Sequence, residues 1–107
     1  MKGFSGTDLE YLSRYSDNLL AVDFHIHSNA SDGLLHPKEV VRFAKENNVV
    51  ALSITDHDTV AGIQDAVDEA IRANIFLVHG IEVSTSYNGK IFHFLGHFIN
   101  PESIKIK

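Results

Sequence analysis

Imidazole and carboxylate side chains lie at or near the ends of three strand-like runs of this chain. The chain has seven histidines and no cysteine. His25 and His27 end the first run, Asp56 and His57 end the second, and Glu82 lies near the end of the third. Imidazole and carboxylate ligands suit zinc, manganese and iron. Without cysteine the chain can form neither a disulfide nor a thiolate metal site, so any metal must be bound by these nitrogen and oxygen atoms.

Most of these residues also have an ordinary structural explanation. A His-x-His pair can be two half-buried strand residues, and Asp32 before Gly33 is typical of a turn. Asp56 and Asp58 flank a helix start, where carboxylates satisfy free backbone amides. Glu82 is harder to explain in this way, because a carboxylate in the apolar run 75–83 is costly to bury without a cation. His93 also lies among large apolar residues. Several such groups at one edge of a sheet favour one shared site.

Four strand-like runs would have to position these groups. In residues 19–27 polar and apolar positions alternate, so His25 and His27 share one face of the strand. The carboxyl ends of parallel strands meet at one edge, where loops converge around ligands. His57 and its neighbour Asp56 point to opposite faces, and we expect His57 to face this edge. The expected strands are residues 19–27, 49–55, 75–83 and 90–99.

Helical patterns separate the first three of these strands. Pro37 suits a first helical position, and the pair Asn47–Asn48 is expected to end that helix. Thr59 is expected to cap the next helix. Strands connected by helices of this length predict an α/β fold of parallel βα units with right-handed crossovers. A capping-box pattern at residues 7–16 predicts a short amphipathic helix, which we treat as an N-terminal helical extension over residues 1–18.

The pair Asn88–Gly89 predicts a hairpin turn between the last two strands. His93 falls early in its strand, and this turn would return it towards Glu82. The other histidines are expected to have structural or surface roles, and we leave them out of the site: His36, His79 and His97.

The composition, with 44% hydrophobic and 21% charged residues, is that of an ordinary soluble globular chain. No apolar run approaches the roughly 20 residues that span a bilayer, and no secretory signal is visible, so we expect a cytoplasmic protein without membrane contact. The net charge of −5 offers no general footprint for nucleic acid. A phosphate-bearing substrate would therefore have to be attracted locally, and bound metal cations could supply that attraction.

Four stretches, in this order and spacing, make the chain resemble the polymerase and histidinol phosphatase (PHP) superfamily over about residues 21–100. Any one of these stretches is a weak signal, but all four in order are hard to reach by chance. The details resemble the branch of small nucleotide and oligonucleotide phosphoesterases. The stretches are Asp23-Phe24-His25-Ile26-His27 with Ser31-Asp32-Gly33, Ile54-Thr55-Asp56-His57-Asp58-Thr59, Gly80-Ile81-Glu82-Val83-Ser84 and His93-Phe94-Leu95-Gly96.

The resemblance implies a metal-dependent phosphoesterase acting through water activated by two or three divalent ions, zinc, manganese or iron. His25 and His27 would bind one ion, and Glu82 would bridge two. The second ion would be held by His93, and the third by Asp32 with His57. Asp56 would be a supporting residue. The expected substrate is a phosphate-ester small molecule or a short oligonucleotide.

The resemblance also implies that residues 19–107 form the N-terminal half of a distorted TIM-like (β/α)7 barrel. Domains of the family exceed 200 residues and supply further ligands from later strands. Six side chains cannot fill the roughly 12 to 18 positions that three ions of four to six coordination require. The sequence leaves three explanations: a fragment, a chain completed by self-association or by a second chain, or a degenerate homologue.

Two alternatives to this function stay open at the level of sequence. In the first, the chain is a non-catalytic metal-binding or interaction module related to PHP domains. In the second, it is a phosphomonoesterase similar to histidinol phosphatase. The identity of the substrate, the metal and the oligomeric state cannot be read from the sequence.

Overall fold

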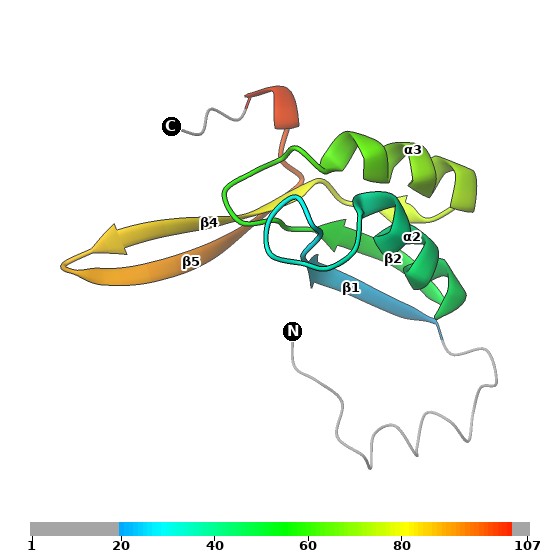
Figure 1. The fold of residues 1–107 in the computed structure, drawn as a ribbon, viewed down its shortest axis with the longest axis horizontal. Helices are drawn as coiled ribbons and strands as arrows, with labels where there is room; N and C mark the ends of the chain where they lie inside the picture. Colours follow the sequence, from blue (N-terminus) through cyan, green and yellow to red (C-terminus); the bar gives the residue numbers. More distant parts are fainter. Residues whose placement is uncertain (1–19, 104–107) are drawn as a thin grey trace, which may run out of the picture.

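The structure, a computed structural model, describes residues 20–103. Two helices connect three parallel strands that form the main sheet, and the order of strands in this sheet is β1-β2-β3 (Figure 1). The predicted parallel βα units are therefore confirmed. The helix expected at residues 7–16 lies outside the described residues. The elements of this unit are β1 (Ala21–Ile26), α2 (Pro37–Glu46), β2 (Val49–Ile54), α3 (Ile63–Ala73) and β3 (Phe76–Leu77).

Helix α2 begins and ends where the sequence predicts. His36 is its N-cap: the ring Nδ1 accepts the Lys38 N–H at 3.1 Å, and the His36 N–H donates to Glu39 Oε1 at 3.3 Å. This reciprocal pairing is a capping box, with Pro37 at the first helical position. Asn48, with φ 60°, turns the chain out of the helix and into β2. The expected structural role of His36 is thus confirmed.

Helix α3 begins later than the sequence predicts. Thr59 does not cap it, because the helix starts at Ile63 with Gly62 as its N-cap, and no side chain bonds to that end. Thr59 Oγ1 instead accepts the Ala61 N–H at 3.1 Å in a local turn. The later start has a physical reason: the backbones of Asp56 and Asp58 form hydrogen bonds to Glu82 in another strand, so this segment is not free to enter the helix.

The hydrophobic core lies between the two helices and the main sheet. Leu52 and Ile54 of β2 point towards the helices and are almost fully buried. Because side chains alternate along a strand, Ser53 and Thr55 point to the opposite face, and they are buried there too. The main sheet is therefore covered on both faces at β2. The buried core residues are Val40, Val41, Ala44, Leu52, Ile54, Ala66, Ala70 and Ile75.

The run 75–83, predicted as one strand, is divided between two sheets. Its first part forms β3, and after a break the chain forms β4 (Gly80–Tyr87), which pairs antiparallel with β5 (Lys90–His97). A side chain at Gly80 would collide with Ser53 Oγ, so glycine allows β4 to start close to β2. The prediction of a single strand was wrong because hydrophobic periodicity does not reveal a change of partner strand.

The predicted hairpin turn is confirmed. Asn88 and Gly89 connect β4 to β5 with φ values of 52° and 76°, and a two-residue hairpin of type I′ requires positive φ at both positions. In Figure 1 the hairpin extends away from the helices and the main sheet. Several of its apolar side chains are exposed, among them Tyr87, Ile91 and Phe94.

A short 3-10 helix, η1 (Pro101–Ser103), ends the described part of the chain. None of the helices between residues 20 and 103 is long and apolar enough to cross a membrane. The mixed α/β fold with parallel βα units is established by these elements. A seven-stranded barrel, in which they would form the N-terminal half, stays a prediction.

Candidate metal centre

The carboxyl end of β1 supplies two imidazoles to the centre. His25 is the fifth residue of β1, and its N–H donates to Asp23 Oδ1 at 3.1 Å, which fixes the backbone beside the ring. His27 follows the strand directly, and its ring lies 5.2 Å from that of His25. A side chain at Gly33 would collide with the His27 carbonyl group, so glycine lets the next loop pass close to His27.

The carboxyl end of β2 supplies the third imidazole. The rings of His57 and His27 are stacked, with centroids 4.4 Å apart and an angle of 17° between their planes. His57 also forms a parallel β-bridge with Glu82. Its neighbour Asp56 points the other way and is only 2% exposed. The predicted opposition of these two residues therefore agrees with the structure.

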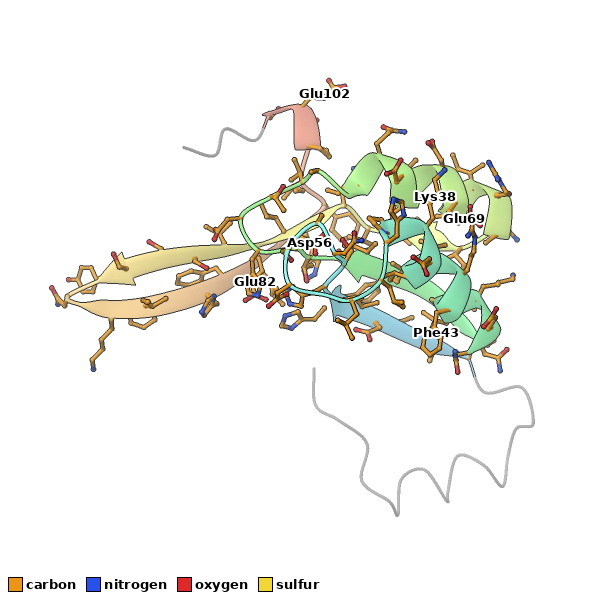
Figure 2. The ribbon with its side chains drawn as sticks, viewed as in Figure 1. Lys38, Phe43, Asp56, Glu69, Glu82 and Glu102 are labelled. Atoms are coloured by element: carbon orange, nitrogen blue, oxygen red, sulfur yellow. The ribbon has the colours of Figure 1, made fainter. Side chains whose placement is uncertain are left out.

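Glu82 lies at the centre of the cluster and is only 6% exposed. Its Oε1 lies 2.7 Å from His25 Nε2 and 3.3 Å from His27 Nε2. Its Oε2 lies 3.4 Å from His57 Nδ1 and 3.2 Å from His93 Nδ1. Each oxygen of one buried carboxylate thus faces a pair of imidazoles. Figure 2 labels Glu82 at the point where the hairpin meets the rest of the fold.

Two opposed effects act on the pKa of the Glu82 carboxyl group. Burial raises the pKa. The hydrogen bond from His25 and the electrostatic attraction of nearby imidazoles, the strongest being that of His57, together lower it by more than burial raises it. The net result is a pKa below the usual value. The group is therefore a carboxylate at neutral pH and acts only as an acceptor or as a ligand.

The hairpin and the loop after β1 complete the cluster. His93 lies opposite Ser84 in the β4–β5 ladder, and the turn returns it to Glu82 as the sequence predicts. Asp32 lies at the outer side of the cluster, with its side chain 65% exposed. Its Oδ1 is 3.4 Å from His27 Nδ1, and its Oδ2 is 3.2 Å from His57 Nε2. All six predicted residues are thus brought together.

The donor atoms form three groups that could each hold an ion, and within each group they lie within 4.8 Å of one another. Two ligands bound at about 2.1 Å to one ion are roughly 3.0 to 3.4 Å apart in octahedral or tetrahedral geometry. Most of the separations given above lie close to this range. In addition, His27 Nδ1 is buried and makes no hydrogen bond, which fits a nitrogen that binds a cation. The groups are His25, His27 and Glu82; His27, Asp32 and His57; and His57, Glu82 and His93.

Asp56 organises the loop that carries Asp32. Its Oδ1 accepts the Ser28 N–H at 2.6 Å and the Ser31 hydroxyl at 2.8 Å, and its Oδ2 accepts the Ser28 hydroxyl at 2.6 Å. Figure 2 shows Asp56 within the area enclosed by this loop. The sequence did not reveal the two serines as partners of Asp56, because no spacing rule links them to a carboxylate 25 to 28 positions away.

The remaining histidines have other partners. His97 Nε2 donates to the Phe24 carbonyl oxygen at 2.8 Å, which ties β5 to β1 and confirms the expected structural role. The His79 carbonyl oxygen accepts the Ile99 N–H at 3.3 Å. Neither histidine contributes an atom to the three donor groups.

Comparison with known proteins assigns a family to most of these residues. The sequence profile of the PHP domain matches residues 23–103. The chain is 45% identical over 74 residues to a 5'-3' exoribonuclease of Haemophilus influenzae, a match that covers 69% of this chain and 27% of the relative. It is 39% identical over 80 residues to a 3',5'-nucleoside bisphosphate phosphatase of Chromobacterium violaceum, a match that covers 75% of this chain and 28% of the relative.

Solved structures agree with the sequence matches. The fold superposes with a TM-score of 0.72 and 39% identity on an amidohydrolase from Chromobacterium violaceum with bound sulfate, over 75% of this chain and 28% of the other. It superposes equally well, at 28% identity, on a protein of Bifidobacterium adolescentis presented as a candidate metal-dependent phosphoesterase, over 77% of this chain and 29% of the other. The chain thus spans less than a third of the length of these relatives.

Proposed function

The chain belongs to the PHP domain family, and on that basis we propose that it forms part of the active site of a metal-dependent phosphoesterase. The substrates are phosphate esters of nucleotides or short oligonucleotides. Six side chains bind the metal ions: His25, His27, Asp32, His57, Glu82 and His93.

The observation that supports this proposal most directly is the surroundings of Glu82. A buried carboxylate is stable only when it is paired or hydrogen bonded. Here the only partners of its two oxygens in the described residues are imidazoles, two for each oxygen. This arrangement suits a carboxylate that bridges two cations.

The residues have separate tasks in this proposal. His25 and His27 would hold one ion together with Glu82, and His93 would hold a second together with Glu82. Asp32 and His57 hold a third. The donor set of nitrogen and oxygen suits zinc, manganese or iron. When bound, such ions act as Lewis acids towards phosphate oxygens and lower the pKa of a bound water.

The burial of the ligands supports a proposed direction of substrate approach. Glu82 and His27 are largely covered, whereas the side chains of Asp32, His25 and His93 are at least half exposed. In this proposal the substrate approaches from the side of these exposed ligands. Nucleotide-like substrates are favoured because the relatives named above are an exoribonuclease and a nucleoside bisphosphate phosphatase.

The proposal is tested by metal content. The purified chain is loaded with Mn²⁺ or Zn²⁺, passed over a desalting column and analysed by inductively coupled plasma mass spectrometry. Glu82→Gln and His25→Ala should lose most of the bound metal, because each removes a donor from the shared group. Glu46→Gln, at an exposed carboxylate at the end of α2, is the matched control and should keep it. Unchanged metal content in both site variants would show that the cluster is not a shared metal site.

A further inference from the structure

The loop after β2 holds the backbone of Glu82 through both its N–H and its carbonyl group. The Glu82 N–H donates to the Asp56 carbonyl oxygen at 3.0 Å, and the Asp58 N–H donates to the Glu82 carbonyl oxygen at 2.9 Å. The two loop residues flank His57, which forms the β-bridge with Glu82. The backbones of two predicted ligands are therefore fixed relative to each other.

Asp58 adds a contact through its side chain. Its Oδ1 accepts the Ser84 N–H at 2.8 Å, two residues further along β4. Ser84 lies directly opposite His93 in the β4–β5 ladder, and its hydroxyl group is 3.2 Å from His93 Nδ1. A single carboxylate thus connects the end of β2 to the part of the hairpin that carries His93.

Other roles for Asp58 do not account for these contacts. It is not a helix cap, because α3 begins five residues later with Gly62 as its N-cap. It is not among the donor groups that could hold an ion. Its φ of 52° lies in the left-handed region, where Asn and Asp are tolerated better than most residues. This backbone turn directs both its N–H and its carboxylate towards β4.

We infer that Asp58 is a positioning residue that sets the angle at which the β4–β5 hairpin leaves the main sheet, and so places His93 at Glu82 Oε2. The inference rests on the proposed function, because the purpose of this placement is metal binding. His93 lies two ladder positions, or about 7 Å, along the strand from the pair formed by Glu82 and Leu95. A tilt of about 10° over that length moves a side chain by about 1 Å, well beyond the roughly 0.2 Å tolerance of a metal site.

Two substitutions separate the carboxylate from the backbone turn. Asp58→Asn keeps an acceptor oxygen and tolerates the left-handed conformation. Asp58→Gly keeps the conformation but removes the acceptor. Asn88→Gly at the hairpin tip is the matched control, because it also places glycine at a left-handed position, with φ 52°, but outside the site.

Two measurements distinguish these variants. The first is hydrogen exchange of the Ser84 amide in the metal-free protein, compared with that of the Leu52 amide in the core. The second is titration with Co²⁺, read from its visible absorption bands. In Asp58→Gly the Ser84 amide should lose protection while Leu52 keeps it, the bands should change, and Co²⁺ affinity should fall about 10- to 100-fold, as for other residues that orient ligands. Asp58→Asn and Asn88→Gly should behave like the original chain.

Each contrary result has a distinct meaning. Wild-type exchange at Ser84 together with an unchanged Co²⁺ spectrum in Asp58→Gly would overturn the role of Asp58. Loss of protection at Leu52 as well as at Ser84 would overturn it too, since Asp58 would then support the whole fold and not the hairpin angle. A wild-type chain that takes up no Co²⁺ would contradict the proposed metal centre, while the exchange data would still decide the role of Asp58.

Discussion

Asp56→Ala tests how the loop that carries Asp32 is held. The carboxylate of Asp56 is 2% exposed and accepts three hydrogen bonds, from the Ser28 N–H, the Ser28 hydroxyl and the Ser31 hydroxyl. Ser28 is itself fully buried. Alanine removes the acceptor for all three donors and leaves a small cavity in their place.

The expected cost is determined by these contacts. The Ser28 N–H cannot turn to another acceptor, and leaving a buried donor unpaired costs about 1 to 3 kcal/mol. The two hydroxyls can rotate, so each costs less. Removing a buried carboxylate also relieves its desolvation, which offsets part of the loss. We expect a net loss of about 3 to 4 kcal/mol in the free energy of unfolding. Asp56→Asn keeps an acceptor of the same shape and should cost about 1 to 2 kcal/mol.

Urea unfolding followed by circular dichroism measures these differences. Asp68→Ala is the control, because Asp68 is an exposed carboxylate that accepts one hydrogen bond, from Gln64 Nε2. This substitution should change stability by less than about 0.5 kcal/mol. If Asp56→Ala is as stable as that control, the hydrogen bonds of Asp56 do not hold the loop and this reasoning fails.

Other contacts support four further predictions. The hydrogen bond from Arg42 lowers the pKa of Glu69. The stability that this pair contributes is therefore complete above the ordinary carboxyl pKa and is lost as pH falls through the lower pKa of the folded state. Glu69→Gln should be less stable than the original chain at neutral pH, and acid unfolding curves should show this difference narrowing as pH falls. Gly80→Ala should cost at least about 2 kcal/mol in urea unfolding through its collision with Ser53; a neutral effect would contradict the close approach. Mn²⁺ at a hundred times its dissociation constant should raise stability by about 2.7 kcal/mol, and chelation or Glu82→Gln should remove the gain in thermal melts. The 107-residue chain alone should bind metal yet hydrolyse a generic phosphate ester weakly, since loosely held ions position reacting groups poorly; robust Glu82-dependent turnover by the monomer would refute this.

Local signals predicted the regular parts of the fold. Pro37 and the Asn47–Asn48 pair indicated the limits of α2 to within a residue, because capping preferences depend on neighbouring residues alone. The Asn88–Gly89 pair indicated the hairpin for the same reason, since few other residues adopt the required positive φ. Strand alternation also placed Asp56 and His57 on opposite sides.

The errors arose where distant contacts decide the structure. Thr59 has the chemistry of a helix cap, but the preceding residues bond to β4, and the helix begins only at Ile63. The division of residues 75–83 between two sheets depends on the close approach of Gly80 to Ser53, which no periodicity records. Both features are fixed by tertiary contacts, which override local preference.

The residues of the candidate site were predictable, but their supports were not. A carboxylate in an apolar run identified Glu82, and resemblance to a family added His93 and Asp32 to it. From the sequence, Asp58 was read as a carboxylate at a helix start. Its contact with the Ser84 amide could not be predicted, because that amide belongs to another sheet. Side chains that hold ligands in place leave no spacing signal of their own.

The separation of the ligands along the chain bears on the order of events in folding. His25 and Glu82 are 57 positions apart in the sequence, and their contact requires both the parallel sheet and the hairpin to be in place. Contacts of such long range are slow to form. We expect an ion that needs ligands from both parts to stabilise the native state and not the transition state, so divalent metal should slow unfolding and leave the folding rate nearly unchanged. Metal binding would then give the protein kinetic stability against unfolding without being required for folding.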